Sequence, residues 1–429
     1  MTEKRPMSGL PARRAVLALL TGVLENGRLL SEMTGEKGPL ERLKPADRAR
    51  AQRLATGTLR HMEQADKLLG PHLRKRPPLA VHNVLRLGIY EICADNAAPH
   101  GVINDLVEIG GRGRETRHQA GLINAVLRKV AENGPDQWAG LPSPKLPKWM
   151  RKQMIADYTK PVVEALELAH SRGAPLDISV KHDPDKWADR LDGTVLPGGS
   201  VRLRTQGQVS QLSGYDEGSW WVQDAAAAMP VKLLAPQRGE KILDLCAAPG
   251  GKTLQMASAG AEVTALDISE QRLLRVRENL KRTGLLAKVV AGDALEYCEP
   301  GFDAILLDAP CSATGTIRRH PDLPHAKDSA DFASLFALQE QMLDHALTLL
   351  APGGRLMFCT CSLLPDEGEI QIEDALKRHS ELRVDSQVLD CDWVDTNWKT
   401  PEGGLRLRPD YWDEMGGMDG FYMACLRKG

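Results

Sequence analysis

The chain has 429 residues, of which 42% are hydrophobic, 26% are charged and eight are cysteines. This length predicts two or three domains, and the composition is typical of a globular protein with sizeable cores. No apolar run approaches the roughly 18 residues of a membrane span, and the short apolar patch near the N-terminus is interrupted by Gly22 and Glu25. We therefore expect a cytoplasmic protein with reduced cysteines and neither a membrane anchor nor a signal peptide.

The net charge of -2 conceals an uneven distribution of charge along the chain. Residues 1–150 carry 24 Lys and Arg against 15 Asp and Glu, whereas the remainder carries 31 against 42. A basic N-terminal third on an acidic body favours a module that binds a polyanion, but a solvated helical surface would give the same balance. Charge alone leaves both interpretations open.

Residues 1–135 are predicted to form an all-helical domain. Apolar residues recur at helical spacing in "ADRARAQRLATGTLRHMEQADKLLG", with arginines between them, and strand patterns are absent. The stretch "NGPDQWAGLPSPKLP", rich in Pro and Gly, then predicts a linker. Residues 136–225 combine this linker with a helical piece and with alternating runs such as "LDISVKH" and "SVRLRTQ", which predicts a small α+β insert.

After residue 225 the pattern changes to short apolar runs that alternate with helical stretches. The runs are "EKILDLC", "AEVTALD", "AKVVAGD", "FDAILLD" and "GRLMFCT". Such alternation predicts a parallel sheet with helices on both faces over residues 226–429. Because ligands of such sheets bind beyond the carboxyl ends of the strands, the residues that end each run are the candidates for chemistry.

The first three runs end in residues that suit a nucleoside. A phosphate-binding P-loop is excluded because Cys246 stands where that motif needs glycine, and the dinucleotide motif GxGxxG is also missing from "DLCAAPGGKT". What remains is a loop of small residues, 247–251, against which a ligand can lie. Asp267 ends the second run, where an acid can bind ribose hydroxyls, and Asp293 ends the third, where it can bind an adenine amino group or merely cap a helix. Together these features favour an adenosine ligand without phosphates, namely S-adenosylmethionine.

Two later strand-end segments, "DAPCSATG" and "CTCS", combine an acid with cysteines. Such cysteines can be packing residues, metal ligands or nucleophiles, and without a CxxC pair we expect no metal site. A thiolate that adds to C6 of a pyrimidine makes C5 nucleophilic toward a sulfonium methyl group, and a second residue can assist its release. Asp308, Cys311 and Cys361 would supply the acid and the two thiols, whereas Cys359, inside the apolar run, is expected in the core. This chemistry does not rank Cys311 against Cys361.

These segments resemble the signature motifs of the NOL/NOP/Sun family of RNA cytosine-5 methyltransferases. The resemblance is carried by "DLCAAPGGKT", "LLDAPCSATG" and "CTCS", with "GSWWVQDAAAAMPV" and "DGFYMACLRK" in support. The N-terminal part is similar to the NusB-like RNA-binding domain in "NVLRLGIYEI", "APHGVINDLVEI" and "GLINAVLRKV". The resemblance covers nearly the whole chain. It implies an all-α NusB-like domain, a small α+β insert and an α/β Rossmann-like class I methyltransferase domain.

The resemblance also implies roles for single residues. Cys361 corresponds to the nucleophile, Cys311 to the cysteine that assists product release, and Asp308 to the acid beside it. The implied contacts to S-adenosylmethionine are Cys246, Ala247, Ala248, Pro249, Gly250, Gly251, Lys252, Asp267, Asp293 and Asp308. Separately, the basic run that leaves the Pro-Cys motif is expected to bind RNA phosphates through Arg318 and Arg319, although an exposed loop would have the same sequence.

Two positions depart from the family pattern. Gly368 stands where the family usually has the asparagine of a Glu-Asn-Glu motif, and the insert has "LDISVKH" where an Arg-Val-Asn type strand is common. Neither departure involves the cysteines, so we expect an active enzyme.

We therefore predict an S-adenosylmethionine-dependent RNA cytosine-5 methyltransferase that acts as a monomer on small-subunit ribosomal RNA, on a cytosine that is single-stranded or flipped out. A DNA cytosine-5 methyltransferase would use the Pro-Cys cysteine as its nucleophile, and the extra cysteine of "CTCS" and the helical domain count against it. The chain could instead be a non-catalytic RNA-binding assembly or antitermination factor, or an enzyme that acts on another RNA. The intact cysteines, acid and cofactor loop favour the enzyme.

Overall fold

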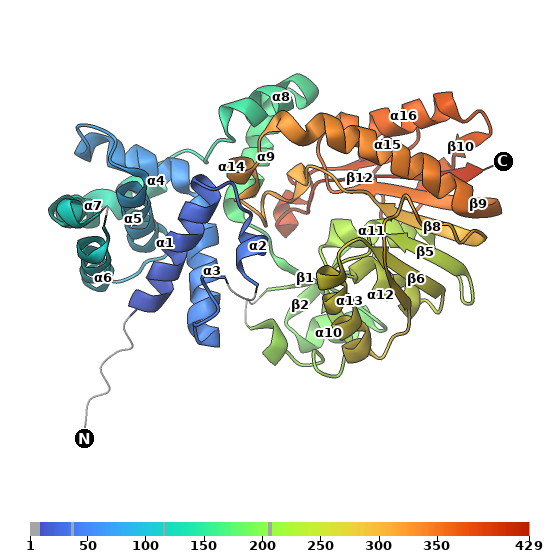
Figure 1. Ribbon diagram of the computed structural model, residues 1–429, viewed down its shortest axis with the longest axis horizontal. Coiled ribbons are helices and arrows are strands. Elements are labelled where there is room, and N and C mark those ends of the chain that lie inside the picture. Colours follow the sequence, from blue (N-terminus) through green and yellow to red (C-terminus); the bar gives the residue numbers. More distant parts are fainter. Residues whose placement is uncertain (1–8, 36–37, 115, 205–207, 429) are drawn as a thin grey trace. The chain divides into compact units, whose positions relative to one another are not determined.

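The computed structural model describes residues 9–35, 38–114, 116–204 and 208–428. The chain forms two compact units, which Figure 1 shows as a ribbon. The helical unit lies within residues 1–172 and also contains 317–329, and the sheet unit consists of 173–316 and 330–429. Each unit is described in turn.

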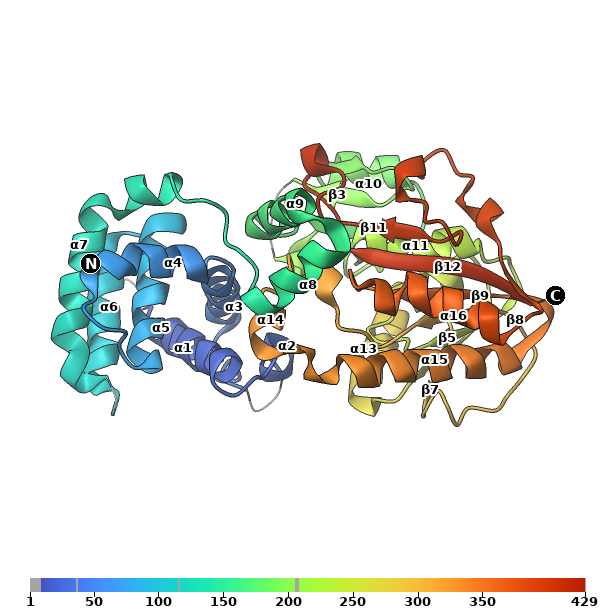
Figure 2. The ribbon, with the colours of Figure 1, turned by 90° about the horizontal axis from the view of Figure 1, so that it is seen from above.

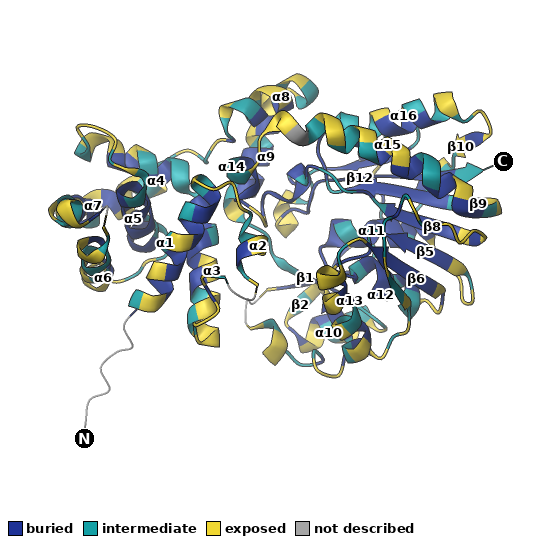
Figure 3. Cartoon of the chain, viewed as in Figure 1, coloured by how far each residue is buried: buried dark blue, intermediate teal, exposed yellow. Residues whose placement is uncertain are grey.

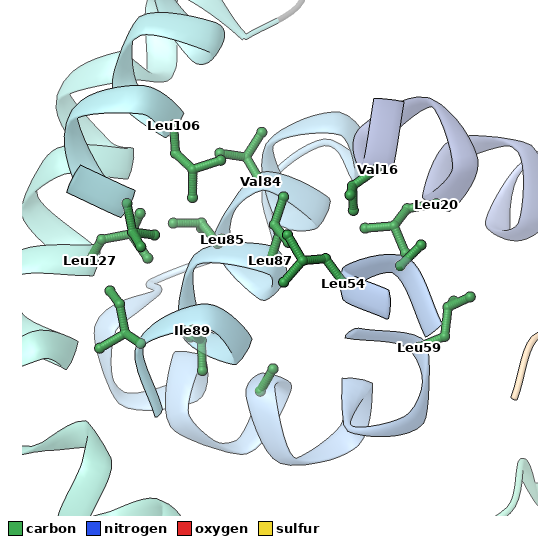
Figure 4. Packing of buried hydrophobic residues seen from close by; sticks show 14 of the residues in the cluster. Val16, Leu20, Leu54, Leu59, Val84, Leu85, Leu87, Ile89, Leu106 and Leu127 are labelled. Carbon is green, nitrogen blue, oxygen red and sulfur yellow. The ribbon is translucent and has the colours of Figure 1, made fainter. Parts of the chain in front are cut away.

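The helical unit is built from amphipathic helices, and those within residues 10–139 share one core. Its α-helices are α1 (Leu10–Leu24), α2 (Leu30–Met33), α3 (Pro45–Arg60), α4 (Met62–Leu69), α5 (Leu79–Ile89), α6 (Pro99–Arg112), α7 (Ala120–Ala139), α8 (Lys148–Tyr158), α9 (Lys160–Arg172) and α14 (Leu323–Ala326). Figure 4 shows leucine, valine and isoleucine side chains from several of these helices meeting in the core. A Cβ atom on Gly88 would lie 2.7 Å from Leu127 and 2.9 Å from Leu106, so this glycine lets α5 approach its neighbours closely. The predicted all-helical N-terminal region is confirmed.

The helical unit extends well beyond residue 135, where the sequence placed its boundary. Part of the predicted linker is helical, because α7 continues to Ala139. Beyond it, the Pro142 carbonyl accepts a hydrogen bond from Gln64 Nε2 on α4 at 3.1 Å. The Leu146 N–H donates to Glu167 Oε1 on α9 at 2.9 Å. These bonds hold the expected linker against α4 and α9. The boundary between the helical unit and the sheet unit therefore falls after residue 172 instead.

The sheet unit begins with a small antiparallel sheet, in the region where the sequence predicts an α+β insert. Its strands are β1 (Leu176–Val180), β2 (Gly193–Val195), β3 (Val201–Leu203) and β4 (Trp220–Val222), in the order β2-β3-β1-β4, with α10 (Pro184–Arg190) beside them. Asp177 on β1 and Arg202 on β3 form a buried pair with two N–O distances of 2.7 Å. This ion pair joins two neighbouring strands of the small sheet.

A larger mixed sheet follows, and it is parallel only in part. Its strands are β5 (Lys241–Leu245), β6 (Glu262–Asp267), β7 (Lys288–Ala291), β8 (Phe302–Asp308), β9 (Leu350–Thr360), β10 (Leu382–Val384), β11 (Leu405–Leu407) and β12 (Phe421–Lys428). The order is β10-β12-β9-β8-β5-β6-β7, with β11 also paired to β12. The strands from β9 to β7 are parallel, as predicted, but β12 runs antiparallel to β9, β10 and β11. The predicted parallel sheet is therefore confirmed for these five strands, and the antiparallel strands beyond β9 make the whole sheet mixed.

Helices cover both faces of the large sheet (Figures 1 and 2). They are α11 (Ala225–Leu234), α12 (Gly251–Ser258), α13 (Glu270–Thr283), α15 (Phe332–Leu349) and α16 (Glu369–Arg378). Leu306 and Met357 share a core with α11 and α12, whereas the adjacent Ile305 and Phe358 share one with α15 and α16. Since successive strand residues point to opposite faces, both faces of the sheet are buried, which Figure 3 shows as dark blue strands.

Candidate active site

The loop between β5 and α12 is bent sharply by positive backbone angles. Cys246 has a φ of 63° and Gly250 a φ of 101°, and the Gly250 N–H donates to the Ala247 carbonyl at 2.8 Å. A Cβ atom on Gly250 would also lie 3.2 Å from Val276 on α13, so glycine suits both the backbone angle and the close approach. The N-terminus of α12 follows directly, which leaves backbone N–H groups free of intrahelical partners there.

Acids lie on or just after the three strands β5, β6 and β7, in different surroundings. Asp267, at the end of β6, is buried and accepts the N–H groups of Ala248 at 3.1 Å and Ser269 at 3.0 Å. Asp293, after β7, accepts the Leu295 N–H at 2.9 Å, but the residues that follow it form a turn and not a helix, so it does not cap one. Asp244, within β5, is a residue that the sequence analysis missed. Burial raises its pKa to about 7.

An ion pair joins the cofactor loop to the strand-end acid of β8. Lys252 Nζ lies 2.7 Å from Asp308 Oδ2 and 5.0 Å from the centre of the Phe421 ring. Burial by itself would lower the pKa of Lys252, but the adjacent Asp308 carboxylate raises it above its usual value. The sequence assigned Lys252 to the cofactor loop alone, whereas its ammonium group contacts the predicted catalytic acid. The pair thus places a positive charge beside the strand ends that carry the cysteines.

The two cysteines of the predicted catalytic pair are neighbours in space. Cys311 Sγ and Cys361 Sγ are 3.5 Å apart, because the parallel strands β8 and β9 end side by side. The hydrogen bond with Cys361, together with burial, raises the pKa of the Cys311 thiol well above its usual value. Cys359 is buried in β9, and burial likewise raises its pKa, which fits the core position expected for it.

Gly368, the departure from the family pattern, lies against an arginine and a tyrosine. A Cβ atom there would be 2.5 Å from Arg406 Nη2 and 2.7 Å from the Tyr422 ring. Arg406 stacks 5.0 Å over that ring and donates to the carbonyl of Ser362, the residue after Cys361. The arginine therefore fills the space that a side chain at position 368 would need, and this accounts for the glycine.

The structure separates the two arginines that were predicted to bind RNA. Arg318 is fully buried, and its carbonyl accepts a hydrogen bond from Arg60 at 2.8 Å. A buried guanidinium offers no surface to a phosphate, so the prediction for Arg318 is not supported by its position. Arg319 is exposed and stays a prediction.

Glu367 and Gln339 were also missed by the sequence analysis, although both lie beside the Pro-Cys turn. Glu367 accepts the Ser312 N–H at 2.9 Å, and Gln339 Nε2 donates to the Pro310 carbonyl at 2.8 Å. Glu367 belongs to the "PDEGE" segment, where the resemblance drew attention only to the glycine. Glutamine in an amphipathic helix carries no signal of its own in a single sequence.

The described residues contain neither a cluster suited to a metal ion nor a helix suited to span a membrane. Among those residues, no three His, Cys, Asp or Glu side chains gather in a way that could hold a metal ion. No helix among them is both long enough and apolar enough to cross a membrane.

The fold and the site together define a methyltransferase with a Rossmann-like catalytic domain and a helical N-terminal domain. Comparison with known families agrees, since residues 231–427 match the family described as 16S rRNA methyltransferase RsmB/F. Residues 10–132 match the NusB family. Ribosomal RNA small subunit methyltransferase B of Erwinia tasmaniensis is 35% identical over 436 residues, which cover 95% of this chain and 96% of that protein. The chain belongs to the RsmB/F family of 16S rRNA methyltransferases.

Solved structures show the same architecture. The crystal structure of PH0851 matches all of this chain with a TM-score of 0.74 at 20% identity, and this chain matches all of it. A methyltransferase homolog protein from Pyrococcus horikoshii has a TM-score of 0.53 at 25% identity, covering 66% of this chain and 100% of that one. The expected fold class, a helical NusB-like part followed by a Rossmann-like methyltransferase domain, is confirmed.

Proposed function

We propose that this enzyme methylates C5 of a cytosine in small-subunit ribosomal RNA through a covalent bond between Cys361 and C6. The single observation that carries the proposal is the 3.5 Å separation of Cys311 Sγ and Cys361 Sγ beside the Lys252–Asp308 pair. One thiol can attack and the other can assist release only if both reach the same base. The membership in a 16S rRNA methyltransferase family supports the choice of RNA.

The strand-end loop suits S-adenosylmethionine as the methyl donor. Asp267 closes β6 beside the loop, where a carboxylate can accept ribose hydroxyls. Gly250, at the tight turn, has no side chain, so a ligand can approach the loop backbone there. The start of α12 presents N–H groups that suit the carboxylate of a methionine moiety. When bound, S-adenosylmethionine supplies an electrophilic methyl group on a sulfonium.

The first part of the reaction is the attack. The Cys361 thiol gives up its proton to water, and its thiolate forms a bond to C6, so the C5–C6 double-bond electrons move toward the ring's N3 and O2. The Lys252 ammonium, held by Asp308, can stabilise the charge that develops there. C5 then becomes nucleophilic enough to take the methyl group.

The second part is release. A base takes the proton from C5, and the C5–H electron pair restores the C5–C6 double bond. The C6–S bond breaks at the same time, and its electron pair leaves on sulfur as the Cys361 thiolate. Cys311 is close enough to assist this step, and its raised pKa suits a group that carries a proton. Without this step the RNA would stay attached to the enzyme.

A denaturing gel tests the assignment. Cys311→Ala and Cys361→Ala proteins are each incubated with labelled small-subunit ribosomal RNA and S-adenosylmethionine. We expect a covalent RNA–protein band only with Cys311→Ala, because Cys361 still attacks but is not released. A band only with Cys361→Ala would reverse the two roles, as in a DNA cytosine-5 methyltransferase. No band in either, with no methyl transfer by the wild type, would overturn the proposed activity on this RNA.

A further inference from the structure

A carboxylate lies buried under the turn that carries Cys311. Glu367, in the 3-10 turn Pro365–Glu367 between β9 and α16, has no exposed surface. Its Oε1 accepts the Ser312 N–H at 2.9 Å, and its Oε2 accepts the Ser312 hydroxyl at 2.5 Å. Hydrogen bonds to an ionised acceptor are about twice as strong as neutral ones, so this carboxylate holds the turn firmly.

The other side of the same turn is held through Gln339 on α15. Gln339 Nε2 donates to the Pro310 carbonyl at 2.8 Å and to Glu367 Oε1 at 3.1 Å. The residues immediately before and after Cys311 are therefore both fixed by one carboxylate and the amide that it orients. Cys311 itself is left to point toward its partner.

Glu367 is also bonded to the segment that carries Cys361. The Thr360 hydroxyl donates to the Glu367 carbonyl at 2.8 Å. The Ser312 hydroxyl, which Glu367 holds, lies 3.2 Å from the Ser362 hydroxyl. Thr360 and Ser362 flank Cys361, so Glu367 connects the neighbours of one catalytic cysteine to those of the other.

We propose that Glu367 is a positioning residue that sets Cys311 against Cys361 and is needed for the release step more than for the attack. The inference rests on the proposed function, because release matters only if a covalent intermediate forms. Cys361 directly follows the last residue of β9, whereas Cys311 lies three residues beyond the end of β8 and depends on these side-chain bonds. The charge of Glu367 also contributes to the raised pKa of the Cys311 thiol, after the hydrogen bond with Cys361 and burial.

The first test is Glu367→Gln, compared with wild type, Cys311→Ala and the control Glu240→Gln. Glu240 is a partly buried carboxylate paired with Arg355 before β5, away from the cysteines. With small-subunit ribosomal RNA and S-adenosylmethionine, Glu367→Gln should transfer one methyl group per enzyme at close to the wild-type rate. Its turnover should fall by about tenfold or more while the covalent RNA band accumulates. Glu240→Gln should behave as wild type. Equal losses of single-turnover transfer and of turnover, without a band, would overturn the positioning role.

A second measurement needs no RNA. Diamide takes up two hydrogens from two adjacent thiols, leaving a disulfide and a hydrazine, and mass spectrometry measures the rate at which Cys311 and Cys361 become linked. We expect this rate to fall by about tenfold in Glu367→Gln and by less in Ser312→Ala, which removes only the hydroxyl contact and serves if the first variant folds poorly. Cross-linking at the wild-type rate in both variants would overturn the inference. If wild type does not methylate the RNA, the proposed function fails, but this rate still decides whether Glu367 positions Cys311.

Discussion

Two ion pairs, one in each unit, differ in how far they are buried. In the helical unit Arg13 and Glu91 meet through two bonds of 2.7 Å, and Arg13 also contacts Asp105. In the sheet unit Lys252 and Asp308 share one bond of 2.7 Å, and the Asp308 side chain remains 30% exposed. The first pair is closed on all sides by the protein. The second is open on the side where a substrate would approach.

This difference in exposure separates a pair that stabilises the fold from a pair that can take part in chemistry. A closed pair satisfies its own hydrogen bonds and serves the fold, whereas an open pair keeps capacity for another molecule. Strand β9 shows a similar difference along its length. Its interior is apolar and buried, whereas thiol and hydroxyl groups lie close together at its carboxyl end. Four substitutions test the contrast, from the largest expected effect to the smallest.

Glu91→Gln should be the most destabilising change. It leaves the Arg13 guanidinium buried with one carboxylate partner fewer, and breaking such a pair costs about 3–5 kcal/mol of unfolding free energy. Urea denaturation followed by circular dichroism measures the loss, and methyl transfer per folded molecule should be unchanged. Glu108→Gln, which removes an exposed pair with Arg112, is the control and should cost less than about 1 kcal/mol. A Glu91 variant of wild-type stability but reduced activity would erase the contrast.

Lys252→Met should lower the activity of the enzyme and leave its stability nearly unchanged. Removal of the ammonium beside the reacting base should lower kcat by about 10²–10³-fold, or roughly 2.7–4 kcal/mol, if Lys252 stabilises charge in the transition state. Because Asp308 is partly exposed, water can replace the lost partner, and the unfolding midpoint should move little. Lys232→Met is the control, since Lys232 is a half-buried lysine that bonds Ser200 instead. A large loss of stability with normal kcat would make Lys252 a structural residue.

Asp244→Asn should change how stability depends on pH. Burial raises the pKa of Asp244 from 3.8 to about 7, so between these values the unfolded chain has lost a proton that the folded protein keeps. The contribution of this group to stability is complete below pH 4 and falls by up to about 1.4 kcal/mol per pH unit as the pH rises toward 7. The asparagine variant should lose this slope in unfolding curves measured from pH 4 to pH 8. Parallel wild-type and variant slopes would contradict the shift.

Gly368→Ala should cost less, about 1–3 kcal/mol, because the added methyl group overlaps Arg406 and the Tyr422 ring. The control is Gly101→Ala on α6, where a Cβ atom would meet nothing within 4 Å. Alanine is a better helix former than glycine by about 1 kcal/mol, so the Gly101→Ala protein should have a slightly higher melting temperature than wild type. Differential scanning calorimetry compares the two. Equal melting temperatures would mean that Arg406 moves aside freely.

The sequence predicted the regular parts of the catalytic domain because their signals are local. Each apolar run from "EKILDLC" to "GRLMFCT" matches one of the parallel strands, and the residues after the runs lie at one edge of the sheet. The antiparallel strand β12, which lies between β10 and β9, was missed because its pairing with β9 depends on contacts far apart in the chain. Strand β12 is buried on both faces over its first six residues, so its sequence does not show the alternation that is common in antiparallel strands.

For the candidate site, too, the sequence predicted the residues with distinctive side chains but not the contacts between distant positions. The cysteines and the acid stand out by residue type, but the Lys252–Asp308 bond joins positions 56 residues apart. The Glu367–Ser312 bond joins positions 55 residues apart. The burial of Arg318 could not be inferred either, since its basic sequence is equally suited to a surface loop. Such pairings arise from the folded chain as a whole.

The segment 317–329 belongs to the helical unit, although it lies in the sequence between the two stretches that form the sheet unit. Its Asp322 carboxylate accepts the Leu30 N–H at 2.8 Å, so it is bonded within the helical unit while both of its ends continue into the sheet unit. The peptide chain consequently passes between the units three times. A protease that cut once after Arg172 would leave two fragments that are still joined by the non-covalent contacts of this segment, such as the Asp322–Leu30 bond. For the same reason, gene fission at that point should still yield a complex from two separate polypeptides.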